Sequence, residues 1–210
     1  MSPRRADPAM PTTLVEAAAR LLAEEGPAAL TTRRLAAEVG TSTTVVYTCF
    51  GGMDDLVRAM VHEGFARLHA LFGAVGESDD PVADIASLGH AYRANALANP
   101  HLYPVMFGGA PLAGFALTDQ DRHYGRFTLD TLIAAVARAV AAGRFLPADP
   151  AEVAHQMWIA LHGLATLDLG GYLVPDAADC FGQQLLLLMI AAGDAPDAAA
   201  RSIALAARRH

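Results

Sequence analysis

Apolar residues recur along most of this chain at intervals of three and four positions, which is the spacing of amphipathic helices. The first such segment predicts a helix over residues 13–25, with one apolar stripe made of Leu14, Val15, Ala18, Leu21 and Leu22. Gly26-Pro27 ends this helix, because proline cannot donate the next backbone hydrogen bond. A second helix is predicted from the N-cap residue Thr31 to Gly40, and a third from Ser42 or Thr43 to Phe50.

The same periodicity continues after the paired glycines 51–52. A fourth helix is predicted over residues 53–72, with Asp54 and Asp55 in its first turn, where the helix dipole favours acidic groups. Gly73 to Pro81 is expected to be a flexible link. Further helices are predicted over residues 82–98, 101–107, 119–142, 150–169 and 177–192, with another from about residue 196. The pattern indicates an all-α protein with a head of residues 1–52, a connecting helix of residues 53–72 and a body of residues 73–210.

Composition narrows the class of protein. Hydrophobic residues make up 53% of the 210 residues, which is ample for a packed core. The longest apolar run, Leu185 to Ala192, is far shorter than the ~18–20 residues that a membrane span needs. Met1 to Pro11 does not have the pattern of a secretory signal, and two cysteines, Cys49 and Cys180, give no disulfide framework. We therefore expect a cytoplasmic protein. In such a protein Cys49 is either a buried, inert thiol or a redox switch.

The charge is distributed unevenly along the chain. The formal net charge is −7, but residues 1–72 carry seven arginines against eight acidic residues, whereas residues 73–210 carry eight against fourteen. The acidic excess therefore lies in the body. A nearly neutral head is compatible with a nucleic-acid partner, although it does not by itself predict one.

The segment Thr31 to Phe50 follows the pattern of a helix-turn-helix. Ala36 supplies the small side chain where two short helices approach, and Gly40 supplies the turn between them. Leu35, Val39 and Val46 are then expected to point inward and bind the pair to the first helix. A helix-turn-helix places its second helix in the major groove of DNA. Short helix pairs of this composition also occur in proteins that never bind DNA.

The wider order of residues resembles the head of TetR-family regulators over roughly residues 12–72. The resemblance rests on the spacing of residues across four helices: Gly26, Thr31, Leu35-Ala36, Gly40, Tyr47, Phe50 and Leu56. In the body, Asn99-Pro100-His101-Leu102-Tyr103 and Trp158-x-x-x-His162-Gly163 resemble a TetR subgroup named for its Trp-His-Gly motif. The resemblance implies a homodimeric DNA-binding regulator with a helical C-terminal domain that dimerises and binds a small molecule.

The same resemblance implies roles for residues of the head. Thr31 and Arg33 would contact phosphates, and the reading helix would contact DNA through Thr43, Thr44, Tyr47 and Thr48. Arg4 and Arg5 would form either an arm on the DNA or a solvated tail.

The chain departs from the family pattern at two positions of this region. Met53 stands where the family usually has lysine, and Cys49 where it often has histidine. The third helix also lacks Arg, Lys, Asn and Gln, the side chains that make bidentate base contacts. Readout is therefore expected to depend on threonine hydroxyls, methyl contacts and DNA shape.

Two C-terminal helices are predicted to form a dimer interface. Leucine, methionine and isoleucine surround the helix over residues 177–192 completely, so it must be covered on both sides. A partner subunit would cover the second side, and the helix that contains Trp158 is its expected companion. The residues assigned to this interface are Gly163, Leu167, Leu185, Leu188 and Met189. The alternative is a buried central helix in a monomer.

Aromatic and sulfur-containing residues of the body are candidates for a ligand pocket. They are Tyr103, Met106, Phe107, Phe127, Trp158 and His162. Each also suits an ordinary core, and His162 is either a polar handle for the ligand or a core histidine bonded to a backbone carbonyl. The small-residue loop Gly108 to Gly114 would gate entry or simply link two helices.

Catalytic and metal sites are not predicted. The eight histidines show no His-x-x-x-His pairing, and no nucleophile elbow or dinucleotide fingerprint occurs. The sequence therefore predicts no cofactor. It favours a repressor that leaves a palindromic operator when a small apolar or amphipathic effector binds the body. The alternative is a helical small-molecule-binding or catalytic protein with a vestigial head. An architectural dimer that binds another protein is a third, weaker hypothesis.

Overall fold

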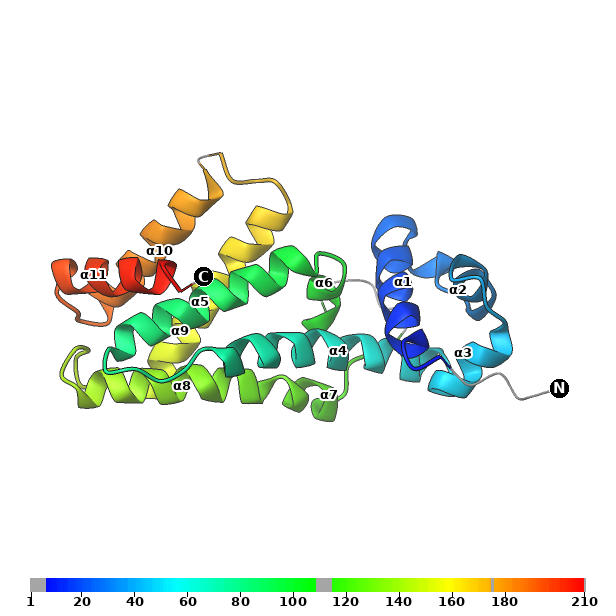
Figure 1. Cartoon of the computed structure of the whole chain (residues 1–210), viewed down its shortest axis with the longest axis horizontal. Coiled ribbons are helices and arrows are strands. Elements are labelled where there is room, and N and C mark those ends of the chain that lie inside the picture. The colour runs from blue at the N-terminus through cyan, green and yellow to red at the C-terminus, as the bar shows by residue number, and fades with distance from the viewer. Residues whose placement is uncertain (1–6, 109–114, 175, 210) are drawn as a thin grey trace. The chain divides into compact units, whose positions relative to one another are not determined.

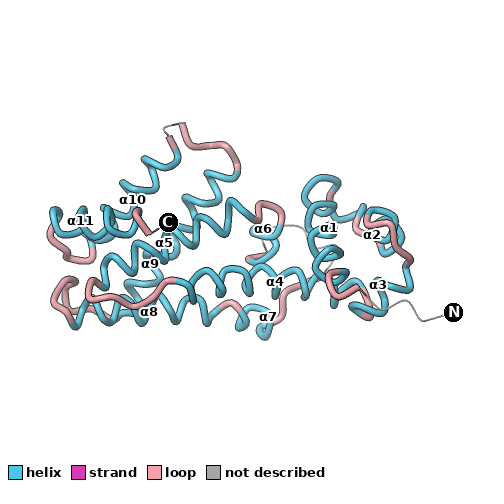
Figure 2. The backbone as a smooth tube through the Cα atoms, viewed as in Figure 1, coloured by secondary structure: helices cyan, strands magenta, loops and turns pink. Residues whose placement is uncertain are grey.

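The structure, a computed structural model, describes residues 7–108, 115–174 and 176–209. These residues form eleven α-helices and one short 3-10 helix, and no strand occurs among them (Figure 2). The predicted all-α fold is confirmed. The predictions for Arg4 and Arg5 and for the loop segment 109–114 lie outside the described residues.

The N-terminal helices follow the predicted order (Figure 1). They are α1 (Met10–Glu25), the 3-10 helix (Pro27–Ala29), α2 (Thr32–Glu38) and α3 (Thr43–Phe50). Gly26 ends α1 with a φ of +81°, and Gly40 makes the turn between α2 and α3 with a φ of +67°. These left-handed backbone angles favour glycine, which has no Cβ to clash.

The remaining helices lie near their predicted positions. Their bounds are α4 (Met53–Ala74), α5 (Pro81–Ala98), α6 (Leu102–Met106), α7 (Asp119–Tyr124), α8 (Arg126–Ala141), α9 (Pro150–Leu169), α10 (Ala177–Ala191) and α11 (Pro196–Ala207). The start of α9 illustrates the local cause, because the Asp149 carboxylate accepts a hydrogen bond from the Ala151 N–H while Pro150 occupies the first turn.

The prediction of a single helix over residues 119–142 is wrong, because the structure has two helices there, α7 and α8, which are separated at Gly125. A Cβ atom at Gly125 would lie 2.4 Å from the ring of Phe65, so that ring occupies the space of the missing side chain. A reciprocal capping box between Thr118 and Asp121 fixes the start of α7.

The chain separates into two compact units. The first comprises Met1–Ala66 and Asn99–Gly125, and the second comprises Arg67–Ala98 and Arg126–His210. The helix α4 therefore contributes residues to both units. Within the first unit, α6 lies against α1 and against Gly64 of α4.

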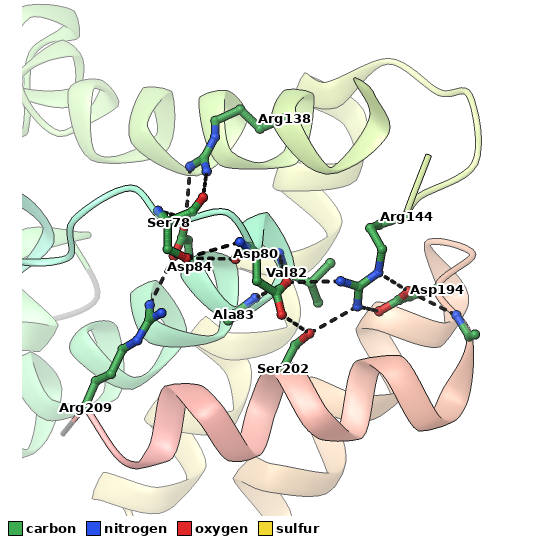
Figure 3. A network of polar contacts seen from close by, with 11 residues as sticks. Ser78, Asp80, Val82, Ala83, Asp84, Arg138, Arg144, Asp194, Ser202 and Arg209 are labelled. Carbon is green, nitrogen blue, oxygen red and sulfur yellow. Dashed lines mark hydrogen bonds and ion pairs between the residues drawn. The ribbon is translucent and has the colours of Figure 1, made fainter. Parts of the chain in front are cut away.

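The prediction of a flexible link from Gly73 to Pro81 is also wrong, because polar contacts hold this segment in place (Figure 3). Gly73 belongs to α4, and the Ser78 backbone N–H and hydroxyl donate to the Asp84 carboxylate at 2.8 and 2.6 Å. Asp84, only 2% exposed, also pairs with Arg138 at 3.0 Å and Arg209 at 3.1 Å. These contacts tie the link and the start of α5 to α8 and to the C-terminal segment.

A second set of contacts extends this polar network (Figure 3). The Arg144 guanidinium binds both oxygens of buried Asp194, at 2.8 and 2.6 Å, and Asp80 at 3.1 Å. The Ser202 hydroxyl donates to Asp80 at 2.6 Å, and the other Asp80 oxygen caps the first turn of α5. The loops before α5, α9 and α11 thus meet at one cluster of compensated charges.

Acidification should weaken this network only at low pH. Burial raises the pKa of Asp84, but hydrogen bonds from Ser78 and the guanidinium groups of Arg138 and Arg209 outweigh it, so the pKa lies below the ordinary 3.8. A carboxyl with a depressed folded-state pKa contributes stability above its unfolded-state pKa and loses it as the pH falls through the folded-state value. In urea titrations, the stability difference between the wild type and Asp84→Asn should stay constant from about pH 7 to pH 5 and shrink below about pH 4. An equal difference at pH 7 and at the lowest pH at which the protein still folds would contradict this assignment.

A close helix contact of the first unit involves Gly64. A Cβ atom there would lie 2.4 Å from Met106 Cγ and 2.8 Å from its Sδ. We therefore expect Gly64→Ala to lower the free energy of unfolding by about 1–3 kcal/mol, although alanine has a better helix propensity than glycine. Gly73, in the last turn of the same helix, has nothing within 4 Å of such an atom. Gly73→Ala should therefore stay within about 0.5 kcal/mol of the wild type. Equal denaturant midpoints for the two variants would show that Met106 adapts at no cost.

Candidate functional site

The third helix presents one exposed polar face. Val46 of α3 and Leu35 of α2 are buried, which fixes α3 on the rest of the helix-turn-helix. On the opposite side, Thr43, Thr44 and Thr48 are exposed, and the Tyr47 side chain is 55% exposed. The structure therefore brings together the four residues that were predicted to contact DNA from this helix.

The two predicted phosphate contacts lie at the start of α2. Thr31 is its N-cap, and the Thr31 hydroxyl oxygen accepts a hydrogen bond from the Arg34 N–H at 3.2 Å. Arg33 is exposed and forms no salt bridge with a residue that the structure describes. An exposed guanidinium without an internal anion is suited to bind a phosphate.

The neighbouring arginine has a different environment. Arg34 pairs with Glu38 and, at 2.8 Å, with Glu25, while Arg20 binds Glu38 at 2.7 Å. Hydrogen bonds from Arg20 and Arg34 lower the pKa of the Glu38 carboxyl. This frame joins α1 to α2, so Arg34 helps to orient the two helices, whereas Arg33 takes no part in it.

Val39 lies between α2 and α3, and Met53 is the first residue of α4. Val39 is half-buried rather than enclosed in the core, because it stands at the C-terminal end of α2, next to the turn. The Thr32 hydroxyl donates to the Met53 sulfur at 3.5 Å, so the residue at the usual lysine position packs against α2. Met53 supplies no charge for a phosphate.

In the second unit, the imidazole of His162, in α9, forms a hydrogen bond with a side chain. Its Nδ1 lies 2.9 Å from the Tyr92 hydroxyl of α5, and burial lowers the pKa of the imidazole. The Trp158 ring lies one turn earlier, with its centroid 6.0 Å from that of His162. Burial therefore favours the neutral form of the His162 imidazole. A neutral imidazole beside the Trp158 indole and the Tyr92 phenol suits an uncharged or amphipathic molecule.

The other predicted ligand-binding residues fall into separate groups. Tyr103 and Met106 are buried in the first unit, where the Tyr103 and Phe107 rings lie 5.4 Å apart. Phe127 belongs to the second unit, with its ring 4.6 Å from that of His69. The six candidates are thus divided equally between the two units.

The helices α9 and α10 pack together and leave apolar side chains exposed. On α9, Ile159 is 57% exposed and Leu167 47%, and nothing lies within 4 Å of a Cβ atom built at the exposed Gly163 between them. On α10, Leu187 is 62% exposed and Ile190 36%. Exposed apolar rows on two neighbouring helices are typical of a protein–protein interface.

Two residues predicted for this interface lie elsewhere. Leu185 and Met189 are each 1% exposed and belong to the core of their own chain, and Leu188 is half-buried. Leu185 packs toward Gly89 of α5, where a Cβ atom would lie 3.0 Å from its side chain. The outward side of α10 therefore carries Leu187 and Ile190 in their place.

Comparison with known families identifies both parts of the chain. Residues 14–60 match the family described as bacterial regulatory proteins, tetR family. Residues 85–188 match the family described as tetracyclin repressor-like, C-terminal domain. The chain belongs to the TetR family. It is thus a transcriptional regulator with a helix-turn-helix, as the spacing of its N-terminal residues indicated.

Solved structures share the fold of this TetR-family protein over most of its length. A protein of unknown function from Rhodococcus sp. RHA1 is 28% identical, with 92% of this chain and 100% of that chain aligned and a TM-score of 0.75. PfmR, a TetR family transcriptional regulator from Thermus thermophilus, is 20% identical over 84% and 97% of the two chains, with a TM-score of 0.70. The fatty acid degradation regulator FadR from Bacillus halodurans is 16% identical over 89% and 97%, with a TM-score of 0.74. The last two similarities concern the fold alone.

A search of curated proteins found no significant match. None of the helices in the described part of this TetR-family protein has the length and hydropathy of a membrane span. Within the same residues, no group of three or more histidine, cysteine or acidic side chains is arranged to hold a metal ion.

Some contacts of this TetR-family protein could not be found from the sequence. Tyr92 is separated from His162 by 70 residues, and Arg93 pairs with Asp168, 75 residues away, at 2.8 Å. Arg93 also lies over the Phe181 ring at 5.6 Å, which joins α5 to α10. The only sequence signal was indirect, since polar residues within an otherwise apolar helix require partners when buried.

Proposed function

We propose that the protein is a homodimeric repressor that binds a palindromic operator and leaves it when a small apolar or amphipathic effector binds the C-terminal domain. The observation that carries the proposal is the exposed face of α3, with Thr43, Thr44, Tyr47 and Thr48 on one side and buried Val46 on the other. A short helix held by its apolar side and bare on its polar side has the form of a recognition helix.

The proposed DNA contacts follow from this geometry. Thr31 and Arg33 bind phosphates at the start of α2, and the exposed residues of α3 contact base edges and the adjacent backbone. Each half-site then offers few strong contacts, because α3 has no side chain capable of a bidentate base contact. Useful affinity consequently requires two heads bound at once.

The proposed dimer uses the outward faces of α9 and α10, with Ile159, Gly163, Leu167, Leu187 and Ile190 at its centre. Two such helices from each subunit would form a four-helix bundle about a two-fold axis. This arrangement covers the exposed apolar side chains of both helices. It also sets the spacing of the two heads, which an operator with half-sites about one helical turn apart requires.

The proposed effector site lies around Trp158 and His162 on α9, with Tyr92 on α5 as a further polar group. We assign the C-terminal domain to the Trp-His-Gly subgroup on the basis of Trp158, His162 and Gly163. The effector acts by binding more tightly to the state whose head spacing does not fit the operator, with α4 as the connecting lever. We place the regulator in the cytoplasm, where its DNA is, and assign it no catalytic role.

Replacing Tyr47 with alanine should weaken specific DNA binding. Fluorescence anisotropy would compare a labelled duplex from the gene's own upstream region with a scrambled duplex, across a salt series. The wild type should prefer the upstream duplex by at least about a hundredfold and weaken steeply with salt. We expect Tyr47→Ala to lose at least about tenfold in affinity for that duplex, because a dimer loses the contact twice. Thr13→Ala, at an exposed position of α1, is the control and should retain the preference.

The alternative function, a small-molecule-binding or catalytic protein with a vestigial head, is favoured by two observations. Met53 packs against Thr32 instead of offering a charge, and the net charge of the chain is −7. This alternative predicts weak, equal binding to both duplexes at every salt concentration. It would be supported if a sequence selected from random DNA also bound no better than its scrambled form.

A further inference from the structure

The exposed face of α3 has an unusual chemical composition. An α-helix turns by about 100° per residue, so Thr43, Tyr47, Thr44 and Thr48 fall within an arc of about 140°. All four are exposed, while the opposite arc contains buried Val46 and half-buried Val45 and Cys49. Three of the four side chains that can enter a groove are threonines.

This face is unable to use the strongest forms of base recognition. No Arg, Lys, Asn, Gln, His, Asp or Glu occurs between Thr41 and Phe50. Bidentate contacts to guanine or adenine, and carboxylate contacts to cytosine, are therefore absent from this helix. The groups that remain are hydroxyls, methyl groups and one phenol ring.

The hydroxyl of Thr48 is already engaged within the helix. It donates to the Thr44 carbonyl oxygen at 2.8 Å, so its proton is not available to a base acceptor. The γ-methyl group is then the part of this exposed side chain that a base can contact. A threonine methyl is one of the groups that pack against the C5-methyl of thymine in the major groove.

We propose that α3 recognises its operator through thymine C5-methyl groups, and that Thr48 is the residue that makes this contact with its γ-methyl group. The 55% exposed Tyr47 ring, at the preceding position, adds apolar surface beside it. The inference rests on the proposed function, because it requires that α3 enters the major groove. It names the chemical feature of DNA that this TetR-family head selects.

One other use of Thr48 competes with this proposal. Its hydroxyl oxygen retains lone pairs that could accept a hydrogen bond from an amino group of adenine or cytosine. The two uses depend on different atoms of the side chain. Valine keeps the methyl group and removes the hydroxyl, whereas serine keeps the hydroxyl and removes the methyl group.

The test begins with a binding site selected from random duplex DNA by the full-length protein. Each thymine of the selected half-sites is then replaced by deoxyuridine, which removes only the C5-methyl group. Anisotropy titrations measure the affinity of wild type, Thr48→Val and Thr48→Ser for every duplex. Thr13→Val and Thr13→Ser are the controls, since the exposed Thr13 hydroxyl also donates to the carbonyl four residues earlier, at 3.1 Å.

We expect deoxyuridine at one thymine of a half-site to lower wild-type affinity about fourfold, the factor that burying one methyl-sized group gives. Substitution in both half-sites should cost about fifteenfold, because the dimer makes the contact twice. Thr48→Val should bind like the wild type and keep this sensitivity. Thr48→Ser should bind about fourfold more weakly per half-site and no longer distinguish thymine from deoxyuridine there.

The contrary outcomes separate the inference from the proposed function. Specific binding that is unchanged by deoxyuridine at every thymine, or selected half-sites without thymine, would overturn the inference and leave the regulator intact. Loss of affinity in Thr48→Val with retention in Thr48→Ser would assign recognition to the hydroxyl and overturn it too. Failure to select any sequence would overturn the proposed function, and the inference with it. Far-ultraviolet circular dichroism would verify that each variant is folded.

Discussion

Replacing Leu187 with arginine should convert the protein from a dimer to a monomer and remove its specific binding to DNA. Leu187 is 62% exposed on the outward side of α10. In a two-fold dimer each copy is buried once, so the loss of apolar burial from two side chains that are each 62% exposed costs about 2–4 kcal/mol per dimer. An unpaired guanidinium buried at the interface costs several kcal/mol more. Sedimentation equilibrium should therefore show a dimer for the wild type and a monomer for Leu187→Arg at micromolar concentration.

Leu205→Arg is the matched control for this experiment. Leu205 is also exposed, at 40%, but it lies on α11. The control should remain a dimer and keep its affinity for the operator, and both variants should have wild-type helix content. If both stay dimeric, the exposed faces of α9 and α10 are not the interface, and another surface must set the head spacing.

The second large effect is expected at Asp84. Its carboxylate is 2% exposed and compensates two guanidinium groups, those of Arg138 and Arg209, while it also accepts two hydrogen bonds from Ser78. Removal of one partner from a buried ion pair leaves an uncompensated charge and typically costs about 3–5 kcal/mol. We therefore expect Asp84→Ala to lower the free energy of unfolding by that amount in urea titrations monitored by circular dichroism.

A neighbouring aspartate provides the control. Asp79 lies in the same loop, is exposed and forms no described contact, so Asp79→Ala should change the free energy of unfolding by less than about 0.5 kcal/mol. Similar midpoints for the two variants would mean that solvent replaces the Asp84 carboxylate at little cost. The network of Figure 3 would then have no substantial role in holding the loops of the second unit together.

Local signals account for the features that the sequence predicted well. The helix α9 has the predicted bounds, 150–169, because Asp149-Pro150 specifies its start and the chain turns at Gly170. The N-cap role of Thr31 and the turn at Gly40 are equally local. Each depends on residues within one helical turn of the boundary, so the sequence alone contains the information.

Distant partners explain the features that the sequence missed. The break at Gly125 depends on the Phe65 ring, which is 60 positions away along the chain. Ser78 and Asp80 resemble linker residues until Arg138, Arg144 and Ser202 approach them through the fold. No local pattern reveals such contacts.

The inward side of α10 was unpredictable for another reason. Its residues from Leu185 to Ile190 are all apolar, so the sequence contains no polar stripe to mark the outer face. Only the packing against α5 distinguishes Leu185, inside, from Leu187, outside. The chemistry of the α3 face, in contrast, could be predicted, because the turn positions fix which residues are exposed.

Selection of binding sites from random duplex DNA by the full-length protein tests the central claim most directly. A dimeric regulator with two helix-turn-helix heads should enrich an inverted repeat whose half-sites are about 10 base pairs apart from centre to centre, or a multiple of that distance. Leu187→Arg, as a monomer, should enrich no such repeat. Enrichment of a single unrepeated sequence by the wild type, or of no sequence at all, would contradict the proposal that this TetR-family protein acts as a dimeric repressor.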